Sequence, residues 1–207
     1  HAWSQAFGGT GDDQAQGLGT DGTGTVVMTG AYSATASFGG ASLTSSGSRD
    51  IFVARYSSAG VHEWSRGFGN TLSDYGKDVG IDGSGNVVLT GYFYGTVNFG
   101  GWPLTNPSGS DVFLAKYNAS GTHLWSRNFS GTSSNYAWSV DITADGSLLL
   151  AGEFWGTANF GGSDLTSTGY TDGFIARYDA AGDHQWSRGF GGPLGSDAAL
   201  GIVADSA

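Results

Sequence analysis

A repeat of constant length constrains the possible folds of this chain more than any other feature. The motif His-x-Trp-Ser recurs every 61 residues, at His1, His62, His123 and His184. The chain is therefore a single repeat array, residues 1–207, made of the units 1–61, 62–122 and 123–183 and the partial unit 184–207. Repeats of this kind are typical of architectures in which each unit is stable only when it stacks on its neighbours.

Each unit is predicted to contain four short strands. In the second unit these are residues 63–68, 78–81, 87–93 and 111–117, which alternate in polarity or are rich in β-branched and aromatic side chains. The segments 82–86 and 118–121 are rich in residues that favour turns. The composition agrees, because 38 residues are Gly and only 13% are charged, which disfavours helices.

Four short strands per unit predict an all-β fold, a β-propeller built from tandem 61-residue four-stranded blades. We expect three full blades with flanking strands, an orphan outer strand at the start and an orphan inner strand near Leu200–Val203. Three blades form only an open arc, since closed rings have about four blades or more. The ring is therefore expected to be incomplete or part of a larger one. Another copy of the chain, or further repeats of a longer parent chain, would complete it.

Aromatic side chains recur at fixed positions in the units and predict the packing between blades. Burial of one such side chain stabilises a fold by about 1.5–3 kcal/mol. The rows are Trp3, Trp64, Trp125 and Trp186; Phe7, Phe68, Phe129 and Phe190; Phe52, Phe113 and Phe174; and Tyr56, Tyr117 and Tyr178.

The run Asp111–Arg127, the run Gly85–Gly91 and the motif Phe-Gly-Gly at Phe38, Phe99 and Phe160 together resemble the SBBP repeat. This is a seven-bladed β-propeller repeat family of bacterial, largely secreted or surface proteins. The resemblance implies a propeller and a protein that is extracellular or at the bacterial cell surface. It implies no activity.

No set of residues predicts catalysis, so the chain is expected not to be an enzyme and to have no catalytic residues. The segment Gly17–Gly22 matches G-x-G-x-x-G, but a strand-like run follows it and not the helix that a dinucleotide site needs. The two Glu residues, Glu63 and Glu153, lie in different units at unlike positions. No Ser-His-Asp set can be identified.

Cofactors and charged partners are also not expected, with calcium as the open alternative. The chain has no Cys, and its four His residues occupy one repeat position, where each is expected to bond a nearby backbone group. Asp82–Asn86 lacks the order of a calcium loop, whereas Asp12, Asp13 and Asp74 lie in loops that a propeller would gather near its channel. A net charge of −10 disfavours nucleic acid and anionic membranes, and no apolar run is long enough for a membrane span.

Positions that differ between the units are the candidates for binding, because packing alone does not dictate them. Three such sets are Ser33, Tyr94 and Trp155; Ala41, Trp102 and Ser163; and Gln16, Lys77 and Trp138. Among these we select Tyr94, Trp102 and Trp155 as candidate ligand-binding residues. Their rings would stack on a sugar or contact a partner protein. The alternative is that they cover the edge of their own blade.

These observations favour a non-catalytic structural or protein-interaction module of an exported bacterial protein. The partners expected are other repeats of its kind and a glycan or a surface protein. Lectin-like carbohydrate binding through the loop aromatics is the first alternative. A scaffold for an enzyme whose site lies outside this chain is the second.

Overall fold

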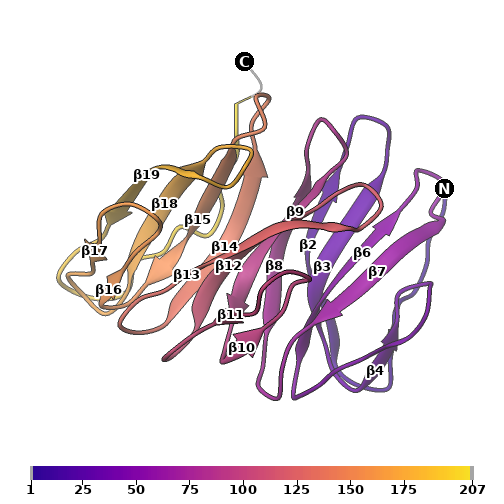
Figure 1. Ribbon diagram of the computed structural model, residues 1–207, viewed down its shortest axis with the longest axis horizontal. Helices are drawn as coiled ribbons and strands as arrows, with labels where there is room; N and C mark the ends of the chain where they lie inside the picture. The colour runs from indigo at the N-terminus through magenta and orange to yellow at the C-terminus, as the bar shows by residue number, and fades with distance from the viewer. Residues whose placement is uncertain (1, 206–207) are drawn as a thin grey trace.

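The computed structural model describes residues 2–205, and all regular structure within them is β-strand (Figure 1). Three antiparallel four-stranded sheets follow one another along this part of the chain, each in the order of its sequence. The first contains β2 (Asp13–Thr20), β3 (Val26–Tyr32), β6 (Asp50–Tyr56) and β7 (His62–Phe68). The second contains β8 (Tyr75–Ile81), β9 (Val87–Phe93), β12 (Asp111–Tyr117) and β13 (His123–Phe129). The third contains β14 (Asn135–Ile142), β15 (Leu148–Phe154), β18 (Asp172–Tyr178) and β19 (His184–Phe190).

The repeated all-β architecture predicted from the sequence is thus confirmed. The strand expected over residues 78–81 begins earlier, at Tyr75, because Tyr75 pairs with Tyr92 of β9. Each sheet ends with the His-x-Trp-Ser strand of the following unit, so the sheets are offset from the 61-residue units.

Very short strands fill the long connection between the second and third strands of each sheet. In the first unit, β1 (Gly8–Gly9), β4 (Thr35–Ser37) and β5 (Leu43–Thr44) form a small sheet. The second and third units have the hairpins β10 (Thr96–Val97) with β11 (Leu104–Thr105) and β16 (Thr157–Ala158) with β17 (Leu165–Thr166). The Phe-Gly-Gly motif turns each of these connections back toward the sheet.

The Phe-Gly-Gly turn has a definite packing role. The Phe99 ring stacks on Phe113 at 4.4 Å, and its carbonyl oxygen accepts a hydrogen bond of 2.7 Å from the Tyr117 hydroxyl. The second glycine lies over the imidazole of His123, and a Cβ at Gly101 would be 2.6 Å from a carbon of that ring. Glycine is required because no side chain fits there. The same hydrogen bond recurs from Tyr56 to Phe38 and from Tyr178 to Phe160.

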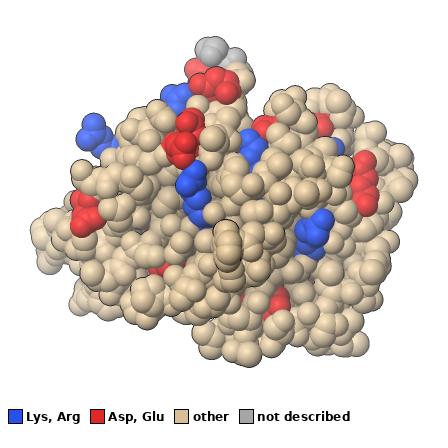
Figure 2. Space-filling model, in the orientation of Figure 1, with Lys and Arg blue, Asp and Glu red and all other residues tan. Residues whose placement is uncertain are grey.

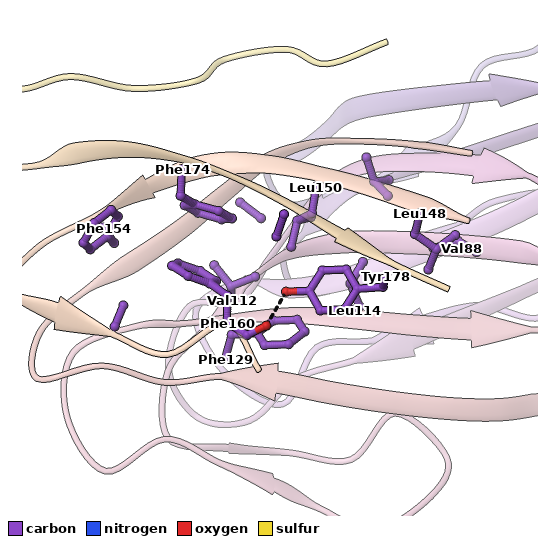
Figure 3. Packing of buried hydrophobic residues seen from close by; sticks show 14 residues of the cluster. Val88, Val112, Leu114, Phe129, Leu148, Leu150, Phe154, Phe160, Phe174 and Tyr178 are labelled. Atoms are coloured by element: carbon purple, nitrogen blue, oxygen red, sulfur yellow. Dashed lines mark hydrogen bonds between the residues drawn. The ribbon is translucent and has the colours of Figure 1, made fainter. Parts of the chain in front are cut away.

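Neighbouring sheets pack face to face, and their first strands lie next to each other, β2 against β8 and β8 against β14 (Figure 1). Glycine permits this approach, since a Cβ at Gly17 would lie 2.6 Å from the Cα of Asp78. The aromatic side chains of one sheet's last strand contribute to the core of the next. Phe129 of β13, for example, is packed among Phe160 and Tyr178 of the third unit (Figure 3).

The two flanking strands predicted at the ends of the chain are absent from the structure. Residues 3–7 cover the first sheet without pairing, with the Phe7 ring 4.9 Å from Tyr56. The inner strand expected near Leu200–Val203 runs beside β14 but forms no ladder. Both segments lack, within residues 2–205, the neighbouring strand with which their counterparts pair.

The last sheet consequently has an open face. Phe190 of β19 is 44% exposed, whereas the corresponding Phe68 and Phe129 are 8% and 5% exposed, and Trp186 on the same strand is 37% exposed. The difference arises because a following sheet covers Phe68 and Phe129, and no described sheet covers β19. We name Trp186 and Phe190 the open face.

A buried ion pair provides a test of the packing between the second and third sheets. Lys116 contacts Asp82 at 2.9 Å, with side chains only 6% and 8% exposed, and also donates to the Ala180 carbonyl. Lys116→Met leaves Asp82 buried without its counter-charge and is expected to lower the free energy of unfolding by about 3 kcal/mol. The measurement is urea-induced unfolding.

The matched control is Arg177→Met, at the same repeat position. Its partner is Asp145 at 3.0 Å, but the two side chains are 36% and 62% exposed. Exposed pairs contribute only about 0–1 kcal/mol. Equal losses in the two variants would contradict the assignment of Lys116 as a buried link.

Candidate functional site

Side chains that differ between the units gather at one end of the second and third sheets. Each lies on the first strand of a sheet or at the end of the second strand, so the strand ends bring them together. Six residues form this aromatic cluster: Tyr75 and Lys77 of β8, Tyr92 and Tyr94 at the end of β9, and Tyr136 and Trp138 of β14. The first unit has Gln14, Gln16, Ala31 and Ser33 at the positions of Tyr75, Lys77, Tyr92 and Tyr94.

A β-bulge places one residue of each unit in this region. The pairing of the first two strands shifts register around Gln16, Lys77 and Trp138, so each of these residues is left out of the ladder. A bulge re-aims the side chain of the extra residue and removes the pairing constraint on it. One position at which the units differ in chemistry is therefore a position that the sheet constrains little.

The rings of the cluster form a continuous surface across the two sheets. Tyr92 lies at its centre, with ring centroids 5.0 Å from Tyr75, 4.7 Å from Tyr136 and 6.0 Å from Trp138. Tyr136 and Trp138 are stacked at an interplanar angle of 18°. Tyr94 contacts Tyr92 edge-on at 6.3 Å. Tyrosine-rich surfaces of this kind combine apolar area with hydroxyl groups and are suited to recognition.

Lys77 lies among three of these rings. Its ammonium is 5.0 Å from the ring centroid of Trp138, 5.2 Å from Tyr75 and 5.4 Å from Tyr92. These are cation–π distances. The ammonium donates a hydrogen bond of 3.4 Å to the Gln16 side chain, and it forms no ion pair with any described carboxylate. Burial lowers the pKa of Lys77.

A cavity of about 450 Å³ borders the cluster. Its lining comes from the loop before β8, from Ser48 in the connection before β6 and from the tyrosines, and six of the seven residues carry a hydroxyl group. The lining residues are Ser48, Thr71, Leu72, Ser73, Tyr75, Tyr92 and Tyr94.

Asp74 fixes the loop and Tyr94 in place. Its carboxylate is fully buried and accepts hydrogen bonds from the backbone N–H of Asn70 at 3.0 Å and of Tyr94 at 2.9 Å. The Asn70 side chain in turn donates to the Tyr94 carbonyl. Burial raises the pKa of Asp74 to about 6.

The three residues selected from the sequence have different surroundings in the structure. Tyr94 is part of the cluster and lines the cavity. Trp102 is 90% exposed in the turn between β10 and β11, and Trp155 is 51% exposed just after β15. Neither tryptophan makes a ring contact with the cluster in the described part of the chain.

Sequence reasoning did not select Tyr75, Tyr92 and Tyr136. The available signal was the same one that selected Tyr94, because the first unit has Gln14 and Ala31 where the second has Tyr75 and Tyr92. Only the strand register, in which Tyr75 faces Tyr92, shows that these side chains meet.

The residues considered for metals and dinucleotides lie apart. Over residues 2–205, no three His, Asp or Glu side chains come close enough to hold a metal ion. Asp12 pairs with Arg49 at 3.0 Å, and Asp13 accepts the Gly9 N–H. The segment Gly17–Gly22 runs from β2 into a turn and then into β3, so no helix follows it.

The histidine row packs on tyrosine rings. The Nε2 atoms of His123 and His184 bond the hydroxyls of Ser126 and Ser187, and His62 Nε2 is buried without a partner. The expected bonds to backbone groups are therefore wrong at these three positions, because each imidazole is held against a tyrosine ring and a Gly-Gly turn. His1 lies outside the described residues.

Charged side chains are sparse and mixed in sign on the face shown in Figure 2, which displays no continuous basic patch. No helix within residues 2–205 is long and apolar enough to cross a membrane.

Comparison with known proteins yields two distant relatives in sequence. No protein-family model matches the chain. The chain is 33% identical over 145 residues to "Regulatory protein FlaEY" of Caulobacter vibrioides, covering 66% of this chain and 15% of that protein. It is 24% identical over 164 residues to "Uncharacterized WD repeat-containing protein L264" of Acanthamoeba polyphaga mimivirus, covering 70% of this chain and 12% of that one. The chain thus spans a small fraction of both relatives.

Among solved structures, a protein of unknown function from Bacteroides caccae can be aligned with the chain. The alignment covers 86% of this chain and 82% of that chain, at 10% identity and a TM-score of 0.32. A TM-score of this size does not establish a shared fold.

Asp74 predicts a pH dependence of stability. Its pKa is about 6 in the folded chain and near 3.8 when unfolded, so the folded state retains the proton longer. Its contribution to the free energy of unfolding is fully present below about pH 4 and is lost as the pH rises through 6. Asp74→Asn should remove a decline of about 2–3 kcal/mol between pH 4 and pH 7, measured by urea unfolding.

Asn occupies the corresponding position in the third unit, Asn135, so an amide fits there. Asp164→Asn, at an exposed position, is the control and should leave the pH profile of the wild type unchanged. An Asp74→Asn profile parallel to that of the wild type would contradict the assignment.

Proposed function

We propose that the chain is a non-catalytic protein-interaction module, an arc of a β-propeller in an exported or surface-borne bacterial protein. One observation carries this proposal. The residues that recur in every unit pack sheet against sheet, whereas residues that differ between units form the aromatic cluster. A scaffold with one chemically distinct surface is suited to binding.

The β-propeller assignment rests on the arrangement of the sheets. Three four-stranded antiparallel sheets pack in chain order with their first strands adjacent, as blades do around an axis. A relative described as containing WD repeats supports it, since WD40 repeats are propeller blades. The SBBP-type motifs support the exported origin, and the relative from Caulobacter vibrioides supports the bacterial origin.

The open face supports further repeats as one class of partner, supplied by a second copy or by a longer parent chain. Trp64 shows what such a partner would provide. Its indole lies on Gly121 and donates a 2.9 Å hydrogen bond to the Ala119 carbonyl, in the turn that follows β12 of the next sheet. Trp186 has no such turn against it in residues 2–205.

The 207-residue chain alone is therefore expected to self-associate in a concentration-dependent manner. Light scattering measures the molar mass. Trp186→Ser with Phe190→Ser should shift it toward the monomer, and Trp102→Ser, which is exposed elsewhere, should not. A wild-type chain that stays monomeric at all concentrations would overturn this partner assignment.

The interaction function is tested with a variant that carries the side chains of the first unit. The substitutions are Tyr75→Gln, Lys77→Gln, Tyr92→Ala and Tyr94→Ser, matching Gln14, Gln16, Ala31 and Ser33. Binding of labelled wild-type chain to surface proteins of the source cells should be competed by unlabelled wild type and not by this variant. Equal competition by both would exclude the cluster as the interaction surface.

Carbohydrate binding is the second candidate, favoured by the hydroxyl-lined cavity beside three tyrosine rings and by the exposed Trp102 and Trp155. A glycan array separates the two sites. Loss of a glycan signal in Tyr94→Ser would place binding at the cavity, and loss in Trp102→Ala or Trp155→Ala would place it at the loops. Absence of any signal from the folded wild-type chain would end this candidate.

A further inference from the structure

We infer that the cavity beside the aromatic cluster binds an acidic sugar, a pyranose ring whose carboxylate is received by Lys77. This inference rests on the second candidate function, carbohydrate binding, and names its ligand class.

The walls of the cavity fit a sugar ring. Tyr75, Tyr92 and Tyr94 supply aromatic rings, on which the C–H face of a pyranose stacks. Ser48, Thr71 and Ser73 add three aliphatic hydroxyls, each able to donate and accept a hydrogen bond. This density of hydroxyl groups matches a polyhydroxylated ligand better than a peptide, whose side chains would leave most of them unpaired.

Lys77 supplies the charge. Tyr75 and Tyr92 line the cavity and also support the ammonium, at 5.2 Å and 5.4 Å from their ring centroids. Lys77 is not itself among the residues that line the cavity, but a ring stacked on these two tyrosines lies near its ammonium. The sequence has two lysines, and the other, Lys116, is neutralised by Asp82 at 2.9 Å.

The charged side chains named below are engaged by other partners and do not form an ion pair with Lys77. Arg49, next to Ser48, is engaged by Asp12 at 3.0 Å. Glu153, opposite Tyr136 in the β14–β15 pairing, accepts a hydrogen bond from Thr171 at 3.3 Å. Asp74 is buried behind Tyr94 with both oxygens bonded to backbone N–H groups. The only hydrogen bond given by the Lys77 ammonium within the described residues is the 3.4 Å contact to neutral Gln16.

The protein carries a net charge of −10, so an anionic ligand is repelled by most of its surface. A carboxylate ligand would bind only where a cation lacks a counter-ion and the surroundings shield it from the other acids. Lys77, held by three rings, meets the first condition, since none of the ion pairs in the described residues involves it. A neutral sugar would gain the stacking and the hydroxyl contacts but not this charge-assisted bond.

The test compares tri-galacturonic acid with an uncharged galactose trimer by calorimetry at low salt. The wild type should bind the acidic trimer roughly tenfold or more tightly, because a hydrogen bond between charged groups contributes about that factor. Lys77→Gln, which installs the residue of the first unit, should abolish the preference, so that the two trimers bind with equal affinity. Arg66→Gln, which removes an exposed charge elsewhere, is the control and should keep the preference.

The outcomes distinguish this inference from the function on which it rests. Equal affinity for both trimers, or an unchanged preference in Lys77→Gln, overturns the acidic-sugar assignment and leaves carbohydrate binding standing. Binding of neither trimer by the folded chain overturns both. Binding of a Glu-rich peptide with no binding of either sugar also overturns the inference and favours protein interaction. Urea unfolding of each variant verifies that it folds.

Discussion

The structure depends on the burial of aromatic side chains between successive sheets. Each four-stranded sheet is apolar on both faces, and a single sheet would leave its faces in water. The last strand of one sheet contributes rings such as Phe68 and Phe129 to the core of the next. Because each such side chain stabilises the fold by about 1.5–3 kcal/mol, no sheet is stable by itself. This constraint explains the constant repeat length, since an insertion would displace a whole row of contacts.

The Phe-Gly-Gly turn within each unit contributes to the same packing between sheets. The Phe-Gly-Gly turn places a phenylalanine ring on the sheet, offers a carbonyl to a buried tyrosine and leaves room for the histidine ring. Three repeated motifs that look unrelated in sequence thus form one cluster in space. Their recurrence reflects packing and carries no information about a ligand.

The same reasoning shows what could be predicted from the sequence. The strands 87–93 and 111–117 were predictable, because β-branched and aromatic runs between glycine-rich turns have few alternative structures. The beginning of β8 was not, because the bulge at Lys77 interrupts its alternation. The flanking strands were predicted by analogy with complete units. They are absent because a strand needs a partner, which residues 2–205 do not supply at either end.

For the candidate site, sequence comparison between units identified Tyr94 and marked Lys77 and Trp138 as variable. It could not show that Tyr75 and Tyr92 meet, since 17 residues separate them and register is a tertiary property. The comparison also selected Trp102 and Trp155 together with Tyr94 as candidate ligand-binding residues. In the structure both tryptophan side chains are exposed and lie apart from the cluster.

The links between first strands have a consequence for the angle between neighbouring sheets. Asp78 on β8 accepts a hydrogen bond from the Val140 backbone N–H of β14, and Asp141 accepts one from Ala204. These contacts run from side chain to main chain, and no backbone ladder joins the first strands to each other in the described chain. A carboxylate tolerates small changes of tilt that would break a ladder. The angle between neighbouring sheets is therefore set by side-chain volume, so one enlarged or trimmed interface residue would change that angle.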